Sequence, residues 1–581
     1  MPVLLRLTVA LAVATLGVAQ AASAQQAEPA ASAPSHKHYE QTPQAEKPGP
    51  AGQLAPRLQN LGTHTFPTST RRALAQRFMN QGLNLTYGFN HAEAGRAFRE
   101  AARLDPSLAI AYWGQALVLG PNINAPMDPA DEPKALELAR KARSLDSRAS
   151  GKEKALIAAL EKRYSGRPED RAVNDKAYAE AMRDVHRRFP ADPDIATLYV
   201  ESVMDLRPWG YWMRDGRPYE GTEEIVALTE DVMRRHPKHP GALHLYIHLL
   251  EATSTPERAE GAADTLLPLV PGAGHMVHMP SHIYQRVGRY ADAIKSNQLA
   301  VLADEDYITQ CRAQGLYPMG YYPHNIHFLW FAATADGQSR LAIESARKVA
   351  SKIEDGMLTE LPLLAAFRVV PYWALTRFGQ WDEMLREPEP PATSAFLRGG
   401  WHYARGLAFT ATGRLDEAAR ELSALKSLLT DPALEAPLFS PNTGRMVLSA
   451  GPEVLAGEIA AAQGDYAAAI GHLETAVRLE DGLVYTEPSE WHYPPRLALG
   501  AVLLAAGRPA EAETVYWEDL RRFRDNGWAL FGLVRALRAQ KKDDQAAVVE
   551  ARFKKAWARA DVSLTGSRFA APAKVGTSAG R

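Results

Sequence analysis

The chain has 581 residues, 46% of them hydrophobic, so it can bury several domain cores or one long array of repeats. Its formal net charge of −1 gives no overall basic field, which excludes nucleic acid as the expected partner. Its single cysteine, Cys311, excludes both an intramolecular disulfide framework and a metal site built from several thiolates.

The first 24 residues are typical of a secretory signal peptide. Arg6 supplies a positive charge, an apolar stretch follows over 7–18, and Ala22-Ser23-Ala24 forms a cleavage signal. The apolar stretch is shorter than the ~20 residues of a membrane-spanning helix, and no later segment is long and apolar enough to span. We therefore expect an exported protein, periplasmic or secreted, without a membrane span once the signal is removed.

Two further segments have the composition of disordered chain. Residues 25–65 are rich in Pro, Ala, Gln and Glu, which predicts a disordered leader. Residues 561–581 predict a disordered tail. Between them the pattern is helical nearly throughout, and Gly or Pro interrupts it about every dozen residues.

A short motif of small and aromatic residues recurs along this helical region. In 89–117 it contains Ala94 and Phe98, and in 464–481 it contains Tyr466 and Ala469. Related copies occupy 288–304, 378–385, 413–425 and 507–520. Small residues let two helices approach closely, and the aromatic residues fill the space beside them.

These copies resemble tetratricopeptide (TPR) repeats, which are helix–turn–helix units of 34 residues. The resemblance implies an all-α solenoid, because one unit cannot bury its apolar face without neighbours. We expect N-terminal repeats over 70–240, with an irregular section from 121, central repeats over 241–350 and C-terminal repeats over 351–560.

Seven of the 17 histidines lie between residues 244 and 327. We aligned three successive central repeats on the small residue at their twentieth position: Ala259, Ala293 and Ala342. In this register the histidines fall at three positions only: His275 and His324 at the second, His244, His278 and His327 at the fifth, and His248 and His282 at the ninth. These positions share one face of a helix, and the TPR resemblance implies that this face lines a concave groove.

The histidines predict a transition-metal site. Imidazole is a common ligand of Cu and Zn, and His244 with His248 has the i, i+4 spacing of a bidentate pair on a helix. All seven histidines are candidate ligands, and Glu251 is a candidate hydrogen-bond acceptor for one of them. The catalysed reaction, if there is one, does not follow from the sequence.

Two interpretations without a metal stay open. The groove can bind a protein or peptide partner, with Trp113, Tyr321 and Tyr322 among its contacts, or a histidine can act as an acid or base. His278 and His327 are 49 residues apart, 15 more than the repeat period, and the insertion lies within 304–323. Three roles are open for this insertion: a lid over the groove, a source of a metal ligand, or a plain connection between helices. Its composition favours the plain connection. Motifs for phosphate loops, zinc proteases, serine hydrolases and dinucleotide binding are absent.

Overall fold

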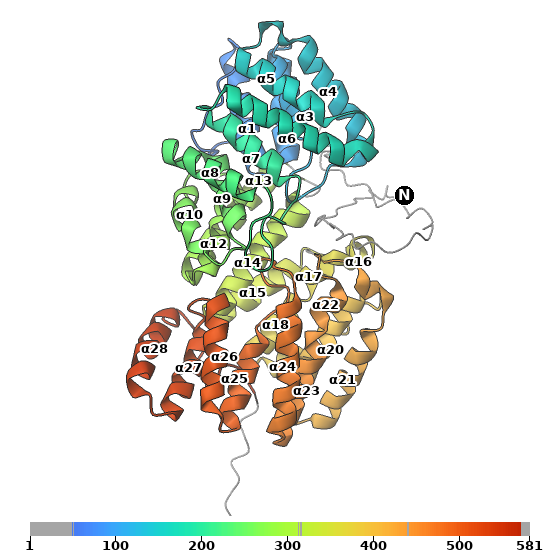
Figure 1. The fold of residues 1–581 in the computed structure, drawn as a ribbon. Helices are drawn as coiled ribbons and strands as arrows, with labels where there is room; N and C mark the ends of the chain where they lie inside the picture. The colour runs from blue at the N-terminus through green and yellow to red at the C-terminus, as the bar shows by residue number, and fades with distance from the viewer. Residues whose placement is uncertain (1–48, 50–51, 312, 314–316, 439–440, 571–581) are drawn as a thin grey trace, which may run out of the picture. The chain divides into compact units, whose positions relative to one another are not determined.

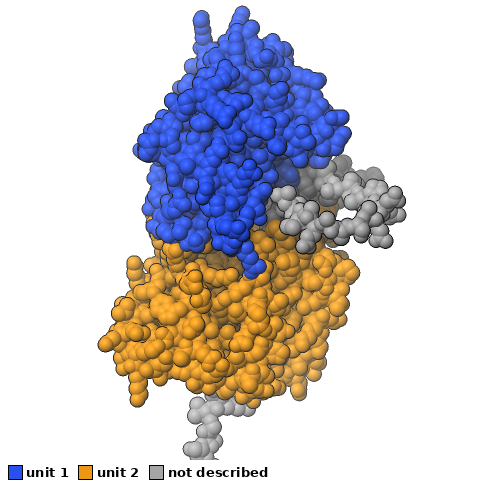
Figure 2. Space-filling view, in the orientation of Figure 1, with its two compact units in different colours: residues 1–283, 296–325 blue, residues 284–295, 326–581 orange. Residues whose placement is uncertain are grey.

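The computed structural model describes residues 49, 52–311, 313, 317–438 and 441–570. The predicted signal peptide, most of the predicted leader and residues 571–581 lie outside them. The chain divides into two compact units (Figure 2): unit 1 comprises residues 1–283 and 296–325, and unit 2 comprises 284–295 and 326–581. The described residues form helices and turns without a β-strand (Figure 1), so the all-α prediction is confirmed.

The helices of unit 1 are α1 (Ala73–Tyr87), α2 (His91–Leu104), α3 (Ala109–Leu117), α4 (Glu132–Ser144), α5 (Gly151–Leu160), α6 (Arg171–Arg188), α7 (Pro193–Met204), α8 (Thr222–Arg235), α9 (Pro240–Leu250), α10 (Glu260–Leu266) and α11 (Gly274–His278). Three helices contribute residues to both units: α12 (Pro280–Arg286), α13 (Tyr290–Cys311) and α14 (Tyr322–Ala335). A π-helix, η6 (Tyr317–Tyr321), precedes α14.

Unit 2 continues with α15 (Ser339–Ala350), α16 (Asp355–Glu360), α17 (Ala365–Arg368), α18 (Val370–Arg377), α19 (Trp381–Arg386), α20 (Ala395–Ala411), α21 (Leu415–Leu428), α22 (Gly444–Leu448), α23 (Ala450–Gln463), α24 (Tyr466–Gly482), α25 (Pro495–Ala505), α26 (Pro509–Arg522), α27 (Gly527–Ala539) and α28 (Asp543–Ala556). The 3-10 turns are η1 (Pro129–Asp131), η2 (Asp146–Arg148), η3 (Glu161–Arg163), η4 (Pro168–Asp170), η5 (Pro256–Ala259), η7 (Pro362–Leu364) and η8 (Pro432–Glu435).

Consecutive helices pack as pairs, as in TPR proteins. In unit 1 the ring of Phe98 on α2 fills the space that Gly82 on α1 and Gly114 on α3 leave open, since a Cβ at either glycine would overlap the ring. In unit 2 Tyr516 on α26 has the same relation to a glycine on α25 and one on α27. Both units therefore interlock neighbouring helix pairs in the same way, and the protein is a TPR-like solenoid.

The turn inside a repeat carries a residue with left-handed backbone. In several repeats it is glycine, for example Gly288 with a φ of 81° and Gly464 with 84°. Phe89 and Lys541 occupy the same place, five residues before the buried alanine, with φ of 55° and 60°. A bulky side chain is rare in this region of φ, and it costs about 1–2 kcal/mol there.

Part of each segment that the composition predicts to be disordered is ordered. Leu54 donates its N–H to Glu100 (2.8 Å), and Ala55 and Phe66 are buried, so the chain from residue 52 packs on unit 1. At the other end, Tyr516 and Ser567 share a hydrogen bond of 2.7 Å in the core of unit 2. Composition missed these anchors because they depend on backbone groups and single side chains.

The central repeats do not form a unit of their own. The boundary between the two units passes through 241–350, where the sequence predicted one segment. The insertion within 304–323 extends α13 to Cys311 and then forms η6, as far as its described residues show. Among all described residues, no helix combines the length and apolar character needed to span a membrane.

Candidate functional site

Helix α9 places two of the histidines. It starts at Pro240, which suits a first helical position, and the side chain of His239 caps it by accepting the N–H of Ala242 at 3.1 Å. His244 and His248 follow one turn apart, and their exposed fractions are 0% and 2%. A third buried histidine, His275, is the second residue of α11.

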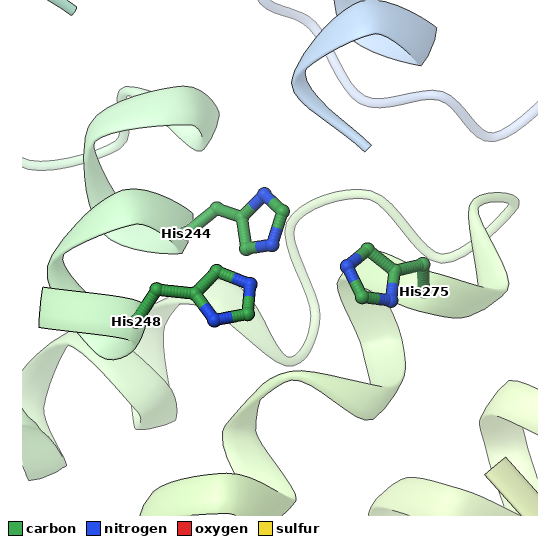
Figure 3. A group of neighbouring side chains, drawn as sticks. All are labelled: His244, His248 and His275. Atoms are coloured by element: carbon green, nitrogen blue, oxygen red, sulfur yellow. The ribbon is translucent and has the colours of Figure 1, made fainter. Parts of the chain in front are cut away.

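These three histidines, the first triad, face one another (Figure 3). One ring nitrogen of each lies within 4.8 Å of the corresponding nitrogens of the other two. The ring centroid of His244 is 4.8 Å from that of His248 and 4.9 Å from that of His275. Metal–imidazole bonds of ~2.0–2.1 Å place tetrahedral ligands about 3.4 Å apart, so rings at this spacing need shift by only about 1 Å to hold one ion.

Hydrogen bonds set the protonation of two of the rings. His244 Nδ1 lies 2.6 Å from the carbonyl oxygen of Tyr87, and His248 Nδ1 lies 2.9 Å from Glu251 Oε1. Both oxygens accept, so both Nδ1 atoms donate and each Nε2 presents a lone pair. This is the arrangement in which histidines bind metals, with an oxygen orienting the far nitrogen.

The nitrogens that face the middle of the first triad have no hydrogen-bond partner among the described residues. This holds for Nε2 of His244, Nε2 of His248 and the nitrogen of His275 that faces them, and the other nitrogen of His275 has no partner either. A buried polar atom without a partner costs roughly 1–3 kcal/mol. Three such rings in one place can offer three nitrogen ligands to one ion.

Burial keeps the triad neutral. It lowers the pKa of His244 and of His275 well below 6.5, and neighbouring histidines lower both further. Burial also lowers the pKa of His248, although Glu251 opposes this. Burial by itself would raise the pKa of Glu251, but His282 and His248 outweigh it and lower that pKa to about 2. An ionised carboxylate therefore stands behind His248 and His282.

Aromatic rings close the space around the first triad. The ring of Phe89 lies 4.6 Å from that of His244, Trp209 lies 5.2 Å from His248, and Tyr321 lies 4.8 Å from His275, centroid to centroid. Phe89 and Trp209 both have left-handed backbone, with φ of 55° and 62°. Strain of this kind gathers at functional sites.

A second triad comprises His278, His282 and His324, and one ring nitrogen of each again lies within 4.8 Å of the others. His278 ends α11, His282 lies on α12, and His324 lies at the start of α14. Nε2 of His278 is 2.8 Å from Nε2 of His282. Nδ1 of His282 lies 2.5 Å from Glu251 Oε2, so one carboxylate contacts a histidine of each triad.

A third group supports the first triad from behind. His239 Nε2 donates to Asp194 (3.1 Å), since its Nδ1 accepts from Ala242, and the hydroxyl of Tyr87 donates to the same carboxylate (2.8 Å). His64 Nε2 also lies 2.8 Å from this oxygen. The network fixes Tyr87, whose carbonyl orients His244.

The remaining candidate residues lie elsewhere. His327 belongs to unit 2, where its ring stacks on Trp330 at 5.2 Å, and neither triad includes it. Trp113 is 1% exposed and stacks on Phe66, so it is a core side chain. The hydroxyl of Tyr322 donates to Glu305 at 2.8 Å. Of the three aromatic residues predicted to line a groove, Tyr321 contacts a triad, through His275.

Sequence reasoning missed Phe89, Trp209 and Asn297. Phe89 had a signal, since an aromatic residue takes the place of a turn glycine. Asn297, whose Oδ1 lies 2.7 Å from His278 Nδ1, had a weaker one: it is a polar residue on the buried face of a predicted helix. No pattern in the sequence places Trp209, which lies in an irregular turn.

No family model matches the chain, and no curated protein matches it. Solved structures of low similarity were found. The human IFIT1 dimer with m7Gppp-AAAA is 12% identical, with 82% of this chain and 93% of that chain covered and a TM-score of 0.30. The APC/C hetero-tetramer Cut9-Hcn1 is 13% identical, with 83% and 76% covered and a TM-score of 0.28.

Proposed function

We propose that this protein is an exported TPR-like scaffold whose unit 1 binds a transition-metal ion, copper or zinc, through His244, His248 and His275. The observation that carries the proposal is the set of buried ring nitrogens without a partner, all turned toward one point. Nε2 of His244 and Nε2 of His248 are presented as lone pairs, and His275 supplies the third nitrogen.

The donor set selects the class of metal. Three neutral imidazoles suit Cu, Zn, Fe and Ni better than Mg or Ca, which prefer oxygen ligands. Three protein ligands also leave a coordination position for water or a substrate, as in catalytic zinc sites. The aromatic rings of Phe89, Trp209 and Tyr321 limit the access of water and hold the site at low polarity.

Burial weighs against a peptide-binding role for these histidines. A groove that binds an extended peptide presents its contact residues to solvent, whereas His244, His248 and His275 are at most 2% exposed. Export rests on the signal-peptide pattern of residues 1–24.

The test is elemental analysis of the full chain, purified without a His-tag or a chelator, beside a His244→Ala/His275→Ala double variant. The matched control is His472→Ala, which removes a partly exposed histidine of unit 2 that pairs with Glu453. We expect at least one equivalent of Cu or Zn in the wild type and in the control, and one equivalent less in the double variant. Absence of metal from the wild type, also after incubation with Cu(II) and Zn(II), would refute the proposal.

A further inference from the structure

The second triad repeats the first in register. In each triad two ligands are the fifth and ninth residues of one repeat, and the third is the second residue of the next repeat. His244, His248 and His275 thus correspond one by one to His278, His282 and His324. The solenoid has placed two copies of one ligand set on successive repeats.

The protons of the second triad do not fit a pair of neutral rings without a metal. His278 Nδ1 lies 2.7 Å from Asn297 Oδ1, and His282 Nδ1 lies 2.5 Å from Glu251 Oε2. Both oxygens accept, so both Nδ1 atoms carry the proton of a neutral ring. The two Nε2 atoms, 2.8 Å apart, then face each other as lone pairs.

Two lone pairs at this distance repel unless a third proton or a metal cation lies between them. A metal ion that binds both nitrogens removes the repulsion. Bonds of ~2.0–2.1 Å at the right angles of square-planar Cu(II) put two ligand nitrogens about 2.9 Å apart, which is close to the spacing observed, and the tetrahedral angles of Zn(II) put them about 3.4 Å apart. His324 stands beside both, with its ring centroid 4.9 Å from that of His278 and 5.9 Å from that of His282.

The two triads are adjacent. The ring centroids of His248 and His282 are 5.9 Å apart, and those of His275 and His278 are also 5.9 Å apart. Glu251 contacts Nδ1 of one histidine from each triad and adds a negative charge that offsets part of the charge of two cations.

We propose that the six histidines form a dinuclear centre, in which the second triad, His278, His282 and His324, holds a second copper or zinc ion next to the first. This inference rests on the proposed function. Two neighbouring ions with imidazole ligands can clamp both oxygens of one substrate or act together on it.

The experiment is a titration of the full chain with Cu(II) alone and, separately, with Zn(II) alone. Bound metal is measured after removal of free ions, and the Cu(II) samples are examined by electron paramagnetic resonance. The variants are His324→Gln and His282→Gln, with His472→Ala as the control. His324 is the most exposed of the six histidines and the variant least expected to disturb folding, and circular dichroism checks each variant.

We expect two equivalents in the wild type and the control, and one in each second-triad variant. The Cu(II) spectrum of the two-ion wild type should be broadened by the nearby second ion, and that of His324→Gln should be sharp. One equivalent in the wild type that His324→Gln leaves unchanged would overturn the dinuclear centre but keep the proposed function. No bound metal at all would overturn both.

Discussion

At the scale of single residues, Glu251 has the largest influence on the candidate site. It is fully buried, and its two oxygens contact His248 and His282, one from each triad. An isolated buried carboxylate would be strongly destabilising, so its presence is explained by the rings that it orients. These contacts turn Nδ1 of each ring toward the carboxylate and leave each Nε2 on the side away from it.

Glu251→Gln should weaken metal binding ~10–100-fold, the usual effect of losing a carboxylate behind a histidine ligand. The amide keeps the size of the side chain, but only one of its two polar atoms can accept from an Nδ1–H. Competition with a chromophoric chelator measures the affinity. Glu223→Gln, an exposed glutamate of α8, is the control and should bind as the wild type does. Unchanged affinity in Glu251→Gln would contradict the role assigned to it.

Glu480 in unit 2 predicts a pH effect away from the triads. Burial raises its pKa from 4.5 to about 8, although Arg522 and Arg496 oppose this. Between these two pH values the folded protein holds a proton that the unfolded chain has released. The contribution of Glu480 to the free energy of unfolding therefore falls as the pH rises through this window.

Glu480→Gln should raise the melting temperature of unit 2 at pH 8 by about 4 °C or more, because the amide has no charge to bury. At pH 5 the side chain is already neutral in the folded wild type, and the two proteins should melt within about 1 °C of each other. Thermal unfolding followed by circular dichroism at both pH values measures this. Equal differences at pH 5 and pH 8 would show that the carboxyl does not titrate in this window.

At the scale of helices and turns, the repeat is modified where it carries the site. Phe89 replaces the turn glycine between α1 and α2, and its ring contacts all three histidines of the first triad. Lys541 takes the place of the corresponding glycine between α27 and α28, in unit 2. Both positions have the strained left-handed backbone, but only Phe89 carries an aromatic ring that contacts the histidines.

Phe89→Gly and Lys541→Gly should therefore have opposite effects. Glycine relieves the left-handed strain at both positions. Lys541→Gly should raise the stability by up to about 1 kcal/mol. Phe89→Gly should lower it by roughly 2 kcal/mol or more, since a buried aromatic ring is lost, and should weaken metal binding. Chemical denaturation and the chelator assay measure both quantities. A stabilised Phe89→Gly with normal metal affinity would be evidence against a role for the ring.

The packing of α11 against α13 sets the position of two histidines, His275 and His278. A Cβ at Gly274 would collide with Asp304 Oδ1 and lie 3.0 Å from the carbonyl oxygen of Ala300. Gly274→Ala should thus displace the start of α11, move His275 and His278, and reduce the bound metal.

Gly261→Ala on α10 is the matched control, because a Cβ there has no neighbour within 4 Å. Alanine should leave metal binding unchanged at this position and stabilise the helix by up to about 1 kcal/mol. Metal analysis and thermal unfolding of both variants make the comparison. If Gly274→Ala bound metal like Gly261→Ala, the close packing of α11 would not position the ligands.

At the scale of the whole molecule, the six histidines of both triads belong to unit 1. A ligand that binds only the folded form stabilises the unit that holds it. Removal of metal should therefore act on unit 1 and leave the interior of unit 2 unaffected.

Hydrogen–deuterium exchange of the metal-loaded and chelator-treated protein tests this. Peptides covering 240–283 should exchange faster after metal removal, and peptides covering 450–540 should exchange at the same rate. A uniform increase along the chain would mean that the metal stabilises the whole array, and no change anywhere would mean that it contributes nothing to the stability of either unit.

The sequence by itself determined the all-α repeat fold and the register of the histidines, because both depend on periodicity along the chain. Helical spacing is enough to place His244 and His248 on one face. Only the tertiary structure decided that His275 completes the first triad and His324 the second, and that His327 joins neither. Those groupings depend on how one helix packs against the next.

The tertiary structure also decided the protonation and the surroundings of the rings. The carbonyl of Tyr87 orients His244, which follows 157 residues later in the chain. The amide of Asn297 on α13 orients His278 on α11. Packing also determines the burial of the histidine rings, the left-handed backbone of Trp209 and the approach of Nε2 of His278 to Nε2 of His282. No periodicity encodes them, because each depends on contacts between segments that only the folded chain brings together.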